Sequence, residues 1–154
     1  MKKIKTVKIG NTMIGQDYPC YIIAEIGSNF DGNLQKAKKL IKLAKDCGAN
    51  AVKFQSFKTD LLLSKKGFVK KNAFQAKWKK SVWKTYQDAE FPRKWHKILN
   101  NFSKKIGIQF FTSPWDFEAV DLLAELNVPV IKIGSGDITY FEMLRYVGKT
   151  GKPV

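Results

Sequence analysis

Six polar residues of the types that bind anionic substrates stand at or near the ends of short apolar runs. They comprise an acid, an amide, two cations and two hydroxyls: Glu25, Gln55, Lys53, Lys132, Ser113 and Ser135. Ammonium groups supply charge and hydroxyls supply directed hydrogen bonds, so the set suits a ligand that carries a phosphate and a carboxylate. A carboxylate near that ligand could act as a base or orient a water molecule.

Each of these residues also has an ordinary structural explanation. A lysine in an apolar strand can be a half-exposed edge residue, and serine or threonine at a strand end is a common turn residue. Glu25 could simply pair with a lysine. The repetition favours a site, because four successive apolar runs each end in a polar group, with Thr112 beside Ser113 at the third.

The opening part of the chain predicts how the first of these residues are positioned. Residues 21–27 and 51–55 are short apolar runs, and residues 34–47 between them are apolar at close to helical spacing. Asn33 can cap this helix, and Gly48 can supply the left-handed residue after its end. Strand, helix and strand in this order predict a βαβ unit with parallel strands, whose carboxyl ends are where such folds bind ligands.

The rest of the chain continues the pattern. A hairpin with a Gly-Asn turn is predicted within residues 1–15. Residues 56–91 are irregular, and the basic stretch 65–80 is too long for an ordinary connection of ~2–6 residues, which indicates a functional loop or lid. Further helices and strands are predicted at 92–105, 106–111, 116–124, 128–133, 140–148 and 151–154.

Alternating strands and helices predict an α/β fold with a parallel sheet. A TIM (β/α)8 barrel has eight such units in about 250 residues, and residues 21–154 supply about four. The prediction is a partial TIM barrel preceded by the hairpin, forming one truncated domain over 1–154 with no second domain. Its two open edges would be an aggregation hazard.

The distribution of charge along the chain indicates which kinds of ligand it could bind. The net charge is +15, and it divides into +6 for residues 1–57, +11 for 58–105 and −2 for 106–154. A basic block can bind nucleic acid, but no nucleic-acid motif accompanies it, so we expect a solvated lysine-rich insertion and no nucleic-acid partner. The remaining field would attract a small anionic substrate.

Localisation is predicted from what the chain contains. No run of about 18 apolar residues is long enough to span a membrane, and the basic start is not a secretory signal. Cys20 and Cys47 are expected to be buried free thiols in a reducing cytoplasm. His96, the only histidine, is expected to be structural, and no cluster with metal-ligand spacing is present.

At these residues the chain resembles the sialic acid synthase family, the phosphoenolpyruvate-condensing synthases of nonulosonic acids. The resemblance covers the amino-terminal half of the family's catalytic barrel. It rests on YIIAEIGSN at 21–29, GANAVKFQ at 48–55, FFTSPWD at 110–116, and IKIGSGD at 131–137 followed by KTGKP at 149–153.

The resemblance implies condensation of phosphoenolpyruvate with an N-acetylated hexosamine, such as N-acetylmannosamine, to a nine-carbon α-keto acid and phosphate. It implies phosphate binding by Lys53, Ser113 and Ser135, and it assigns the phosphoenolpyruvate carboxylate to Lys132. It also implies that Gln55 contacts the sugar. The same likeness makes Glu25 the acid that orients or deprotonates the water, or handles protons at the sugar oxygen.

The chain departs from the family's usual motifs at two positions, and the resemblance also implies a metal cofactor and an oligomeric state. The family's usual Asn-His-Asn-Gly is NFDG at 29–32, and its Ser-Thr-Pro is TSP at 112–114, which keeps the hydroxyl. A divalent cation, Mn or Mg, is implied in the full-length enzyme, with its ligands beyond residue 154, and so is a homodimer. We therefore expect the 154-residue chain alone to be inactive.

Three alternatives remain open from the sequence. Another phosphoenolpyruvate-aldol synthase, such as a keto-deoxy-octulosonate phosphate synthase, would need extra cations for its sugar phosphate, and Arg93 and Arg145 both fall on predicted helices. A basic binding module would bind DNA with a steep salt dependence. An inactive fragment is the third alternative.

Overall fold

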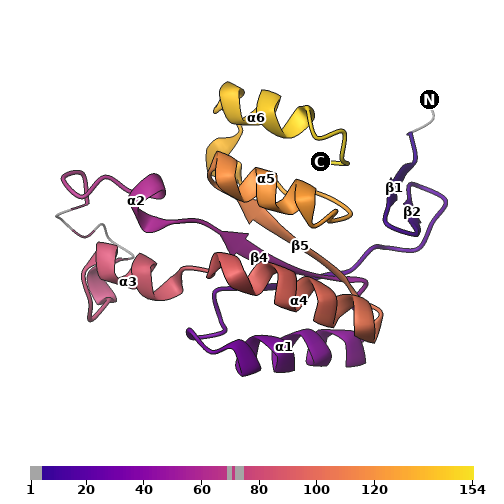
Figure 1. The fold of residues 1–154 in the computed structure, drawn as a ribbon, viewed down its shortest axis with the longest axis horizontal. Coiled ribbons are helices and arrows are strands. Elements are labelled where there is room, and N and C mark those ends of the chain that lie inside the picture. Colours follow the sequence, from indigo (N-terminus) through magenta and orange to yellow (C-terminus); the bar gives the residue numbers. More distant parts are fainter. Residues whose placement is uncertain (1–4, 69–70, 72–74) are drawn as a thin grey trace.

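The computed structural model describes residues 5–68, 71 and 75–154. Within them a three-stranded parallel sheet in the order β3-β4-β5 is flanked by helices, and a separate antiparallel hairpin, β1-β2, precedes it (Figure 1). The elements run β1 Val7–Ile9, β2 Thr12–Ile14, β3 Ile23–Gly27, α1 Leu34–Asp46, β4 Ala51–Ser56, α2 Thr59–Leu62, η1 Gln75–Lys77, α3 Val82–Ala89, α4 Arg93–Ile106, β5 Gln109–Pro114, α5 Phe117–Glu125, η2 Ser135–Asp137 and α6 Phe141–Gly148.

The βαβ unit forms as its signals predict. The Asn33 side chain accepts hydrogen bonds from the Gln35 and Lys36 amides at the start of α1. After the helix, Gly48 takes a φ of +85°, which glycine adopts without a steric penalty. The returning strand β4 then pairs with β3 in parallel, with Ala24 opposite Val52. These short-range signals are sufficient to set the direction of both strands.

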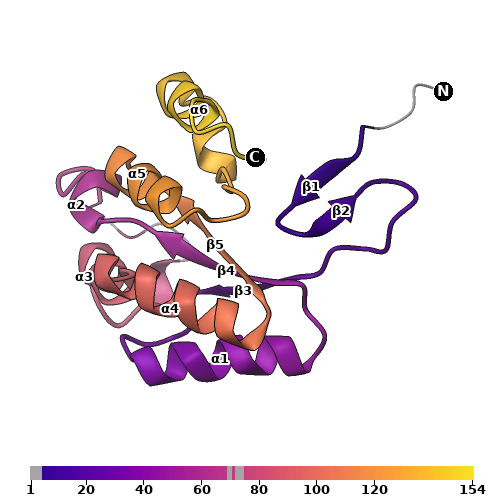
Figure 2. The same cartoon turned by 45° about the vertical axis from the view of Figure 1, so that its right-hand side comes forward.

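The core lies between the sheet and the pair α1 and α4, which run along one side of it (Figures 1 and 2). Alternate strand residues face this side, and Val52, Phe54 and Phe110 are almost fully buried there. Phe91, which precedes α4, stacks on Phe54 with ring centroids 4.8 Å apart. Burial of these large rings stabilises the layer that supports the opposite, inner face of the sheet.

Four expectations about individual segments are wrong. Residues 128–133 and 151–154 form no strand, although Val128, Val130 and Ile131 are buried. Only isolated bonds hold the first of these segments, such as Ile131 N to Pro153 O at 3.0 Å, and a ladder needs a series of them. The region 56–91 contains the helix α3, which begins at the Ser81 cap. Both cysteines are exposed.

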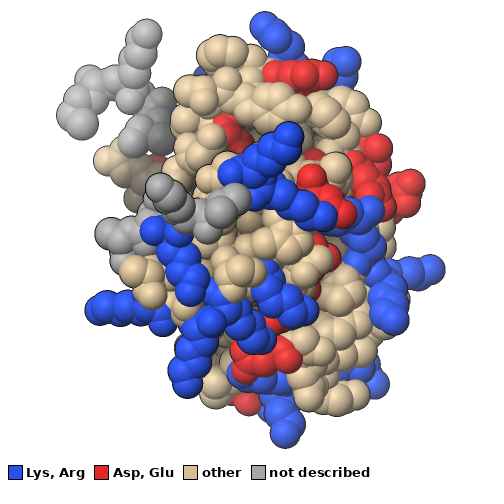
Figure 3. All heavy atoms as spheres, turned by 90° about the vertical axis from the view of Figure 1, so that its left-hand side faces the viewer, with Lys and Arg blue, Asp and Glu red and all other residues tan. Residues whose placement is uncertain are grey.

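The surface charge matches a solvated basic region. Figure 3 shows Lys and Arg side chains gathered over the end of the molecule that carries α2 and α3, with Asp and Glu among them. Several of these lysines are paired, such as Lys80 and Lys84, which both contact Asp88. Within the described part of the chain, no helix combines the length and apolar character needed to cross a membrane.

Candidate functional site

Four of the six predicted site residues meet on the inner face of the sheet. The register places Glu25 opposite Lys53 near the middle of their strands, and Gln55 opposite Ser113 one residue before the carboxyl ends of theirs. The Lys53 ammonium pairs with the Glu25 carboxylate and donates to Ser113 Oγ over 3.4 Å. The side chain of Lys53 is only 12% exposed, whereas that of Glu25 is 46% exposed. A shielded cation therefore stands beside an accessible carboxylate.

Gly27 lies beside two of these four residues. The pairing of β3 with β4 shifts between Glu25 and Gly27, and Gly27 takes a φ of +56°. A Cβ atom at this position would lie 3.4 Å from Glu25 Oε1 and 3.7 Å from Gln55 Nε2. The strand pairing therefore shifts its register beside Gly27, next to both the carboxylate of Glu25 and the amide of Gln55.

The other two predicted residues lie apart from this group. Lys132 is exposed and its ammonium donates to the Ile133 carbonyl, while Ser135 is exposed in η2. In the described residues, neither forms a hydrogen bond or ion pair with Glu25, Lys53, Gln55 or Ser113. In the same turn, partial burial raises the pKa of the Asp137 carboxyl. Four of the six predicted residues therefore lie together in this structure, and their binding of one ligand stays a prediction.

Thr112 corrects a further expectation. Neighbouring strand residues point to opposite faces, so Ser113 faces inward and Thr112 faces α4. There the Thr112 hydroxyl lies 2.6 Å from Ser56 Oγ, which lies 2.6 Å from His96 Nε2. All three side chains are 0% exposed. Thr112 therefore supports the site from behind and does not join it.

The direction of this buried network follows from its last partner. His96 Nδ1 lies 3.0 Å from the Arg93 carbonyl, which can only accept, so Nδ1 carries the proton. Nε2 is then an acceptor, and the Ser56 hydroxyl donates to it. The sequence signal for this network was the alternation itself, because Ser56 and Thr112 flank two inward residues and must find partners on the helical side.

In the NFDG motif at 29–32, the phenylalanine that stands in place of the family's usual histidine packs in the core. Phe30 is fully buried and packs with Phe54, Phe91 and Trp95, with ring centroids 5.6–6.2 Å away. At this position the chain places an apolar ring in the core between the β3–α1 loop and α4. Phe30 therefore contributes packing, and no polar ring reaches the inner face from it.

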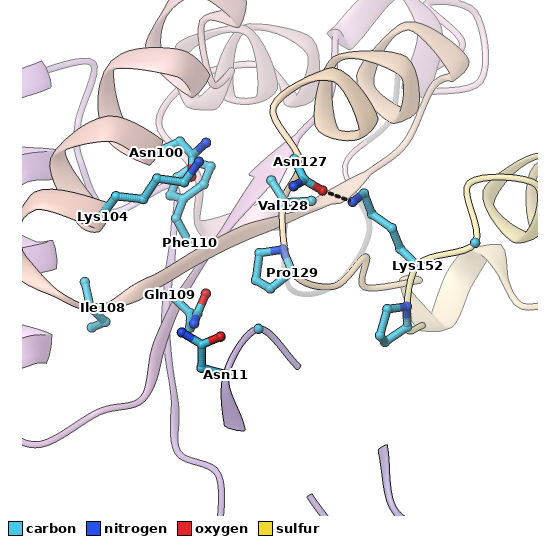
Figure 4. Close-up of a pocket in the computed structure, with 13 residues that line it drawn as sticks. Asn11, Asn100, Lys104, Ile108, Gln109, Phe110, Asn127, Val128, Pro129 and Lys152 are labelled. Atoms are coloured by element: carbon cyan, nitrogen blue, oxygen red, sulfur yellow. Dashed lines mark hydrogen bonds between the residues drawn. The ribbon is translucent and has the colours of Figure 1, made fainter. Parts of the chain in front are cut away.

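Two sizeable cavities lie away from this rim. One of about 470 Å³ lies at the amino ends of the strands, between the hairpin turn, α4 and the segment after α5 (Figure 4). Asn11 and Gln109 meet there, and Lys152 donates to Asn127 Oδ1 over 2.7 Å. Parallel α/β folds bind ligands at the opposite end, so this cavity is not the candidate site.

A metal centre is not assembled by the residues that the structure describes. No group of three or more His, Cys, Asp or Glu side chains among them could hold an ion. His96, the only histidine of the chain, is committed to Ser56 and the Arg93 carbonyl. The prediction that a divalent cation is held by residues beyond 154 stays a prediction.

Relatives of known name match almost the whole chain. It is 37% identical over 141 residues to human N-acetylneuraminate-9-phosphate synthase, covering 92% of this chain and 39% of that protein. It is 43% identical over 136 residues to N,N'-diacetyllegionaminic acid synthase of Campylobacter jejuni, covering 86% and 40%. The chain thus spans about two fifths of the length of these relatives.

Solved structures agree with the fold. N-acetylneuraminic acid (sialic acid) synthetase from Leptospira borgpetersenii, in complex with citrate, matches with a TM-score of 0.82 and 31% identity, over 96% of this chain and 47% of that one. A truncated 3-deoxy-D-arabino-heptulosonate 7-phosphate synthase from Thermotoga maritima matches with a TM-score of 0.66 at 16% identity, over 99% and 44%, which shows a common fold alone.

These likenesses confirm the predicted fold class, a partial TIM barrel preceded by a hairpin. The sequence also matches the NeuB family over residues 40–154. The match covers most of the chain, and its start lies within α1, before β4 and β5 and their inward-facing residues. The chain therefore belongs to the NeuB family, the family of the sialic acid synthases.

Proposed function

We propose that this chain forms the amino-terminal part of the catalytic barrel of a nonulosonic acid synthase. The full-length protein would condense phosphoenolpyruvate with N-acetylmannosamine or a related N-acetylhexosamine and release phosphate. The observation that carries the proposal is the shielded Lys53 ammonium between Glu25 and Ser113, on the inner face of a parallel sheet. The names of the relatives support the same class of reaction.

The proposed reaction forms one carbon–carbon bond and breaks one carbon–oxygen bond. The enol carbon of phosphoenolpyruvate attacks the aldehyde of the open-chain sugar, and the aldehyde oxygen takes up a proton. Water adds to the carbon that bears the phosphate ester and loses a proton. The carbon–oxygen bond to phosphate then breaks and the new hydroxyl passes its proton to the departing phosphate, which leaves a nine-carbon α-keto acid and inorganic phosphate.

The side chains on the inner face can be assigned to these steps. Lys53 and Ser113 would bind the phosphate, because an ammonium and a hydroxyl already meet there. The incoming phosphate would compete with Glu25 for Lys53. The released carboxylate of Glu25 is then free to orient the water or accept its proton. Gln55, beside it, would contact the sugar.

Lys132 and Ser135 are proposed for the carboxylate and phosphate of phosphoenolpyruvate on the resemblance alone. Both follow the buried segment 128–131, and the Lys132 amide contacts the Thr112 carbonyl at 3.5 Å. Their side chains would have to turn toward Ser113 to take part. The implied divalent cation would polarise the aldehyde when bound. The described residues do not form its site, so no step above depends on it.

The direct test is an assay of the full-length protein, defined by reading its coding sequence past codon 154. With N-acetylmannosamine, we expect phosphoenolpyruvate to be consumed and phosphate released in equal amounts. If the bridging oxygen of phosphoenolpyruvate is isotope-labelled, the label should leave with the phosphate, because the carbon–oxygen bond breaks. Retention of the label in the keto acid, or no consumption with any N-acetylhexosamine, would contradict the proposal.

A further inference from the structure

A small aromatic cavity adjoins the inner face at Gln55. It has a volume of about 200 Å³, and its walls include Phe57, Trp78 and Tyr86. Ser28, Thr85 and Ala89 complete it on the side of the β3–α1 loop and α3. Gln55 also lies beside Gly27 and Glu25, so this residue borders both the cavity and the candidate site.

The walls of the cavity are held together by specific contacts. The rings of Phe57 and Tyr86 meet edge to face with centroids 5.8 Å apart, and those of Trp78 and Tyr86 lie 6.3 Å apart. Phe57 is 4% exposed. The Ser28 hydroxyl donates to the Ala89 carbonyl over 2.9 Å, which fastens the end of α3 to the loop after β3. The cavity is therefore a built feature of the rim.

We propose that this cavity, the aromatic subsite, receives the N-acyl group of the hexosamine and sets its permitted length; this rests on the proposed function. Small-molecule pockets commonly have volumes of ~300–1,000 Å³, so about 200 Å³ suits a substituent and not a whole sugar. The methyl of an acetamido group would contact the aromatic rings, and its amide would pair with the amide of Gln55.

The chemistry of the walls disfavours the other parts of the sugar. Neither Lys nor Arg, Asp nor Glu lines the cavity. The wall hydroxyls of Ser28 and Thr85 already donate to backbone carbonyls. A sugar hydroxyl placed against the three aromatic rings would therefore lose hydrogen bonds to water with few donors to replace them, which is unfavourable. The acyl group is the one apolar substituent of an N-acetylhexosamine, so it gains most from this surface.

The test fills the cavity from α3 in the full-length protein. Ala89→Leu adds apolar volume to the wall, and the exposed Gln87→Leu adds it outside the wall on the same helix. We expect wild type to prefer N-acetylmannosamine over mannosamine. The ratio of the two kcat/KM values should fall about tenfold or more in Ala89→Leu, because one methylene more or less in an apolar pocket changes specificity by about this factor. Gln87→Leu should keep the ratio, and both should keep the KM for phosphoenolpyruvate.

A second variant covers the case in which Ala89→Leu does not fold. Tyr86→Leu enlarges the cavity and should raise the use of N-butanoyl-mannosamine relative to the N-acetyl compound. An unchanged acyl preference in active variants would overturn the subsite alone, as would a response to removal of a sugar hydroxyl and not to acyl length. No consumption of phosphoenolpyruvate by wild type with any hexosamine would overturn the proposed function and the subsite with it.

Discussion

Lys53→Met in the full-length protein is expected to lower kcat/KM for phosphoenolpyruvate about 100-fold or more, which is the usual cost of losing one charge-stabilising donor. The Lys53 ammonium is the one cation that the structure shows in contact with both Glu25 and Ser113 on the inner face. Its loss removes the proposed phosphate ligand and leaves the carboxylate to repel the anionic substrate. Steady-state kinetics with phosphoenolpyruvate as the varied substrate measure this.

A matched control separates the site from a general effect of charge. Lys42 also forms an ion pair, with Asp46 at 2.7 Å, but its side chain is 66% exposed on α1. Lys42→Met removes the same charge and a similar pair, and exposed pairs contribute little to stability. We expect its kinetics to match wild type. Equal kinetics for Lys53→Met and wild type would reject the phosphate-binding role.

The βαβ unit could be predicted because its signals act over a few residues. Asn33 and Gly48 mark the ends of α1, and strand alternation separates the buried Val52 and Phe54 from the inward Lys53. Such patterns depend on backbone preference and the period of the element. Features that depend on distant parts of the chain were harder to predict. Residues 128–133 have the apolar composition of a strand, but a strand forms only with a ladder of hydrogen bonds to a neighbouring strand, and the sequence does not show that ladder.

The helix α3 was missed for a related reason. The helix begins after the capping residue Ser81, directly behind a lysine-rich stretch in which apolar residues at helical spacing are hard to recognise. The consequence reaches the site, because Tyr86 and Ala89 on this helix form walls of the aromatic subsite. The functional loop was predicted at residues 65–80, directly before α3, and in the proposed subsite α3 supplies the walls that select the acyl group.

The candidate site was predicted in composition better than in geometry. Four of the predicted residues meet because parallel register aligns the strands side by side, which is a property of the fold class. They are Lys53, Gln55, Glu25 and Ser113. Lys132 follows a segment that forms no hydrogen-bond ladder with a strand, so the direction of its side chain could not be predicted from strand alternation. The exposed cysteines show the same limit, since each lies at an end of an apolar run where burial depends on tertiary packing.

The buried network behind the site gives the second large expected effect. Burial, helped by the positive charge of Arg93, lowers the pKa of His96 from 6.5 to about 4. Protonation would also turn Nε2 into a donor facing the Ser56 hydroxyl. An unfolded chain, in which the imidazole keeps its ordinary pKa, therefore binds a proton in a pH range where the folded chain does not.

This difference predicts a loss of stability on acidification. The contribution of neutral His96 is fully present above about pH 6.5 and is lost as the pH falls toward 4, to a limit of about 3 kcal/mol. Proton NMR of the 154-residue chain can follow His96 alone, because it is the only histidine. Urea unfolding across the same pH range reports the free energy.

Two variants at this network make the expectation specific. In His96→Gln the unfolding free energy should lose the part of its pH dependence that one histidine proton supplies, whereas Ser56→Ala removes a hydrogen bond but keeps the imidazole buried and so keeps the slope. Both should be less stable than wild type at neutral pH, since each disrupts the contact between α4 and the end of β4 that lies behind Gln55. A His96 resonance that titrates near its ordinary pKa in the folded chain, or equal pH slopes for His96→Gln and wild type, would show that the imidazole is hydrated and that α4 does not hold the rim through this network.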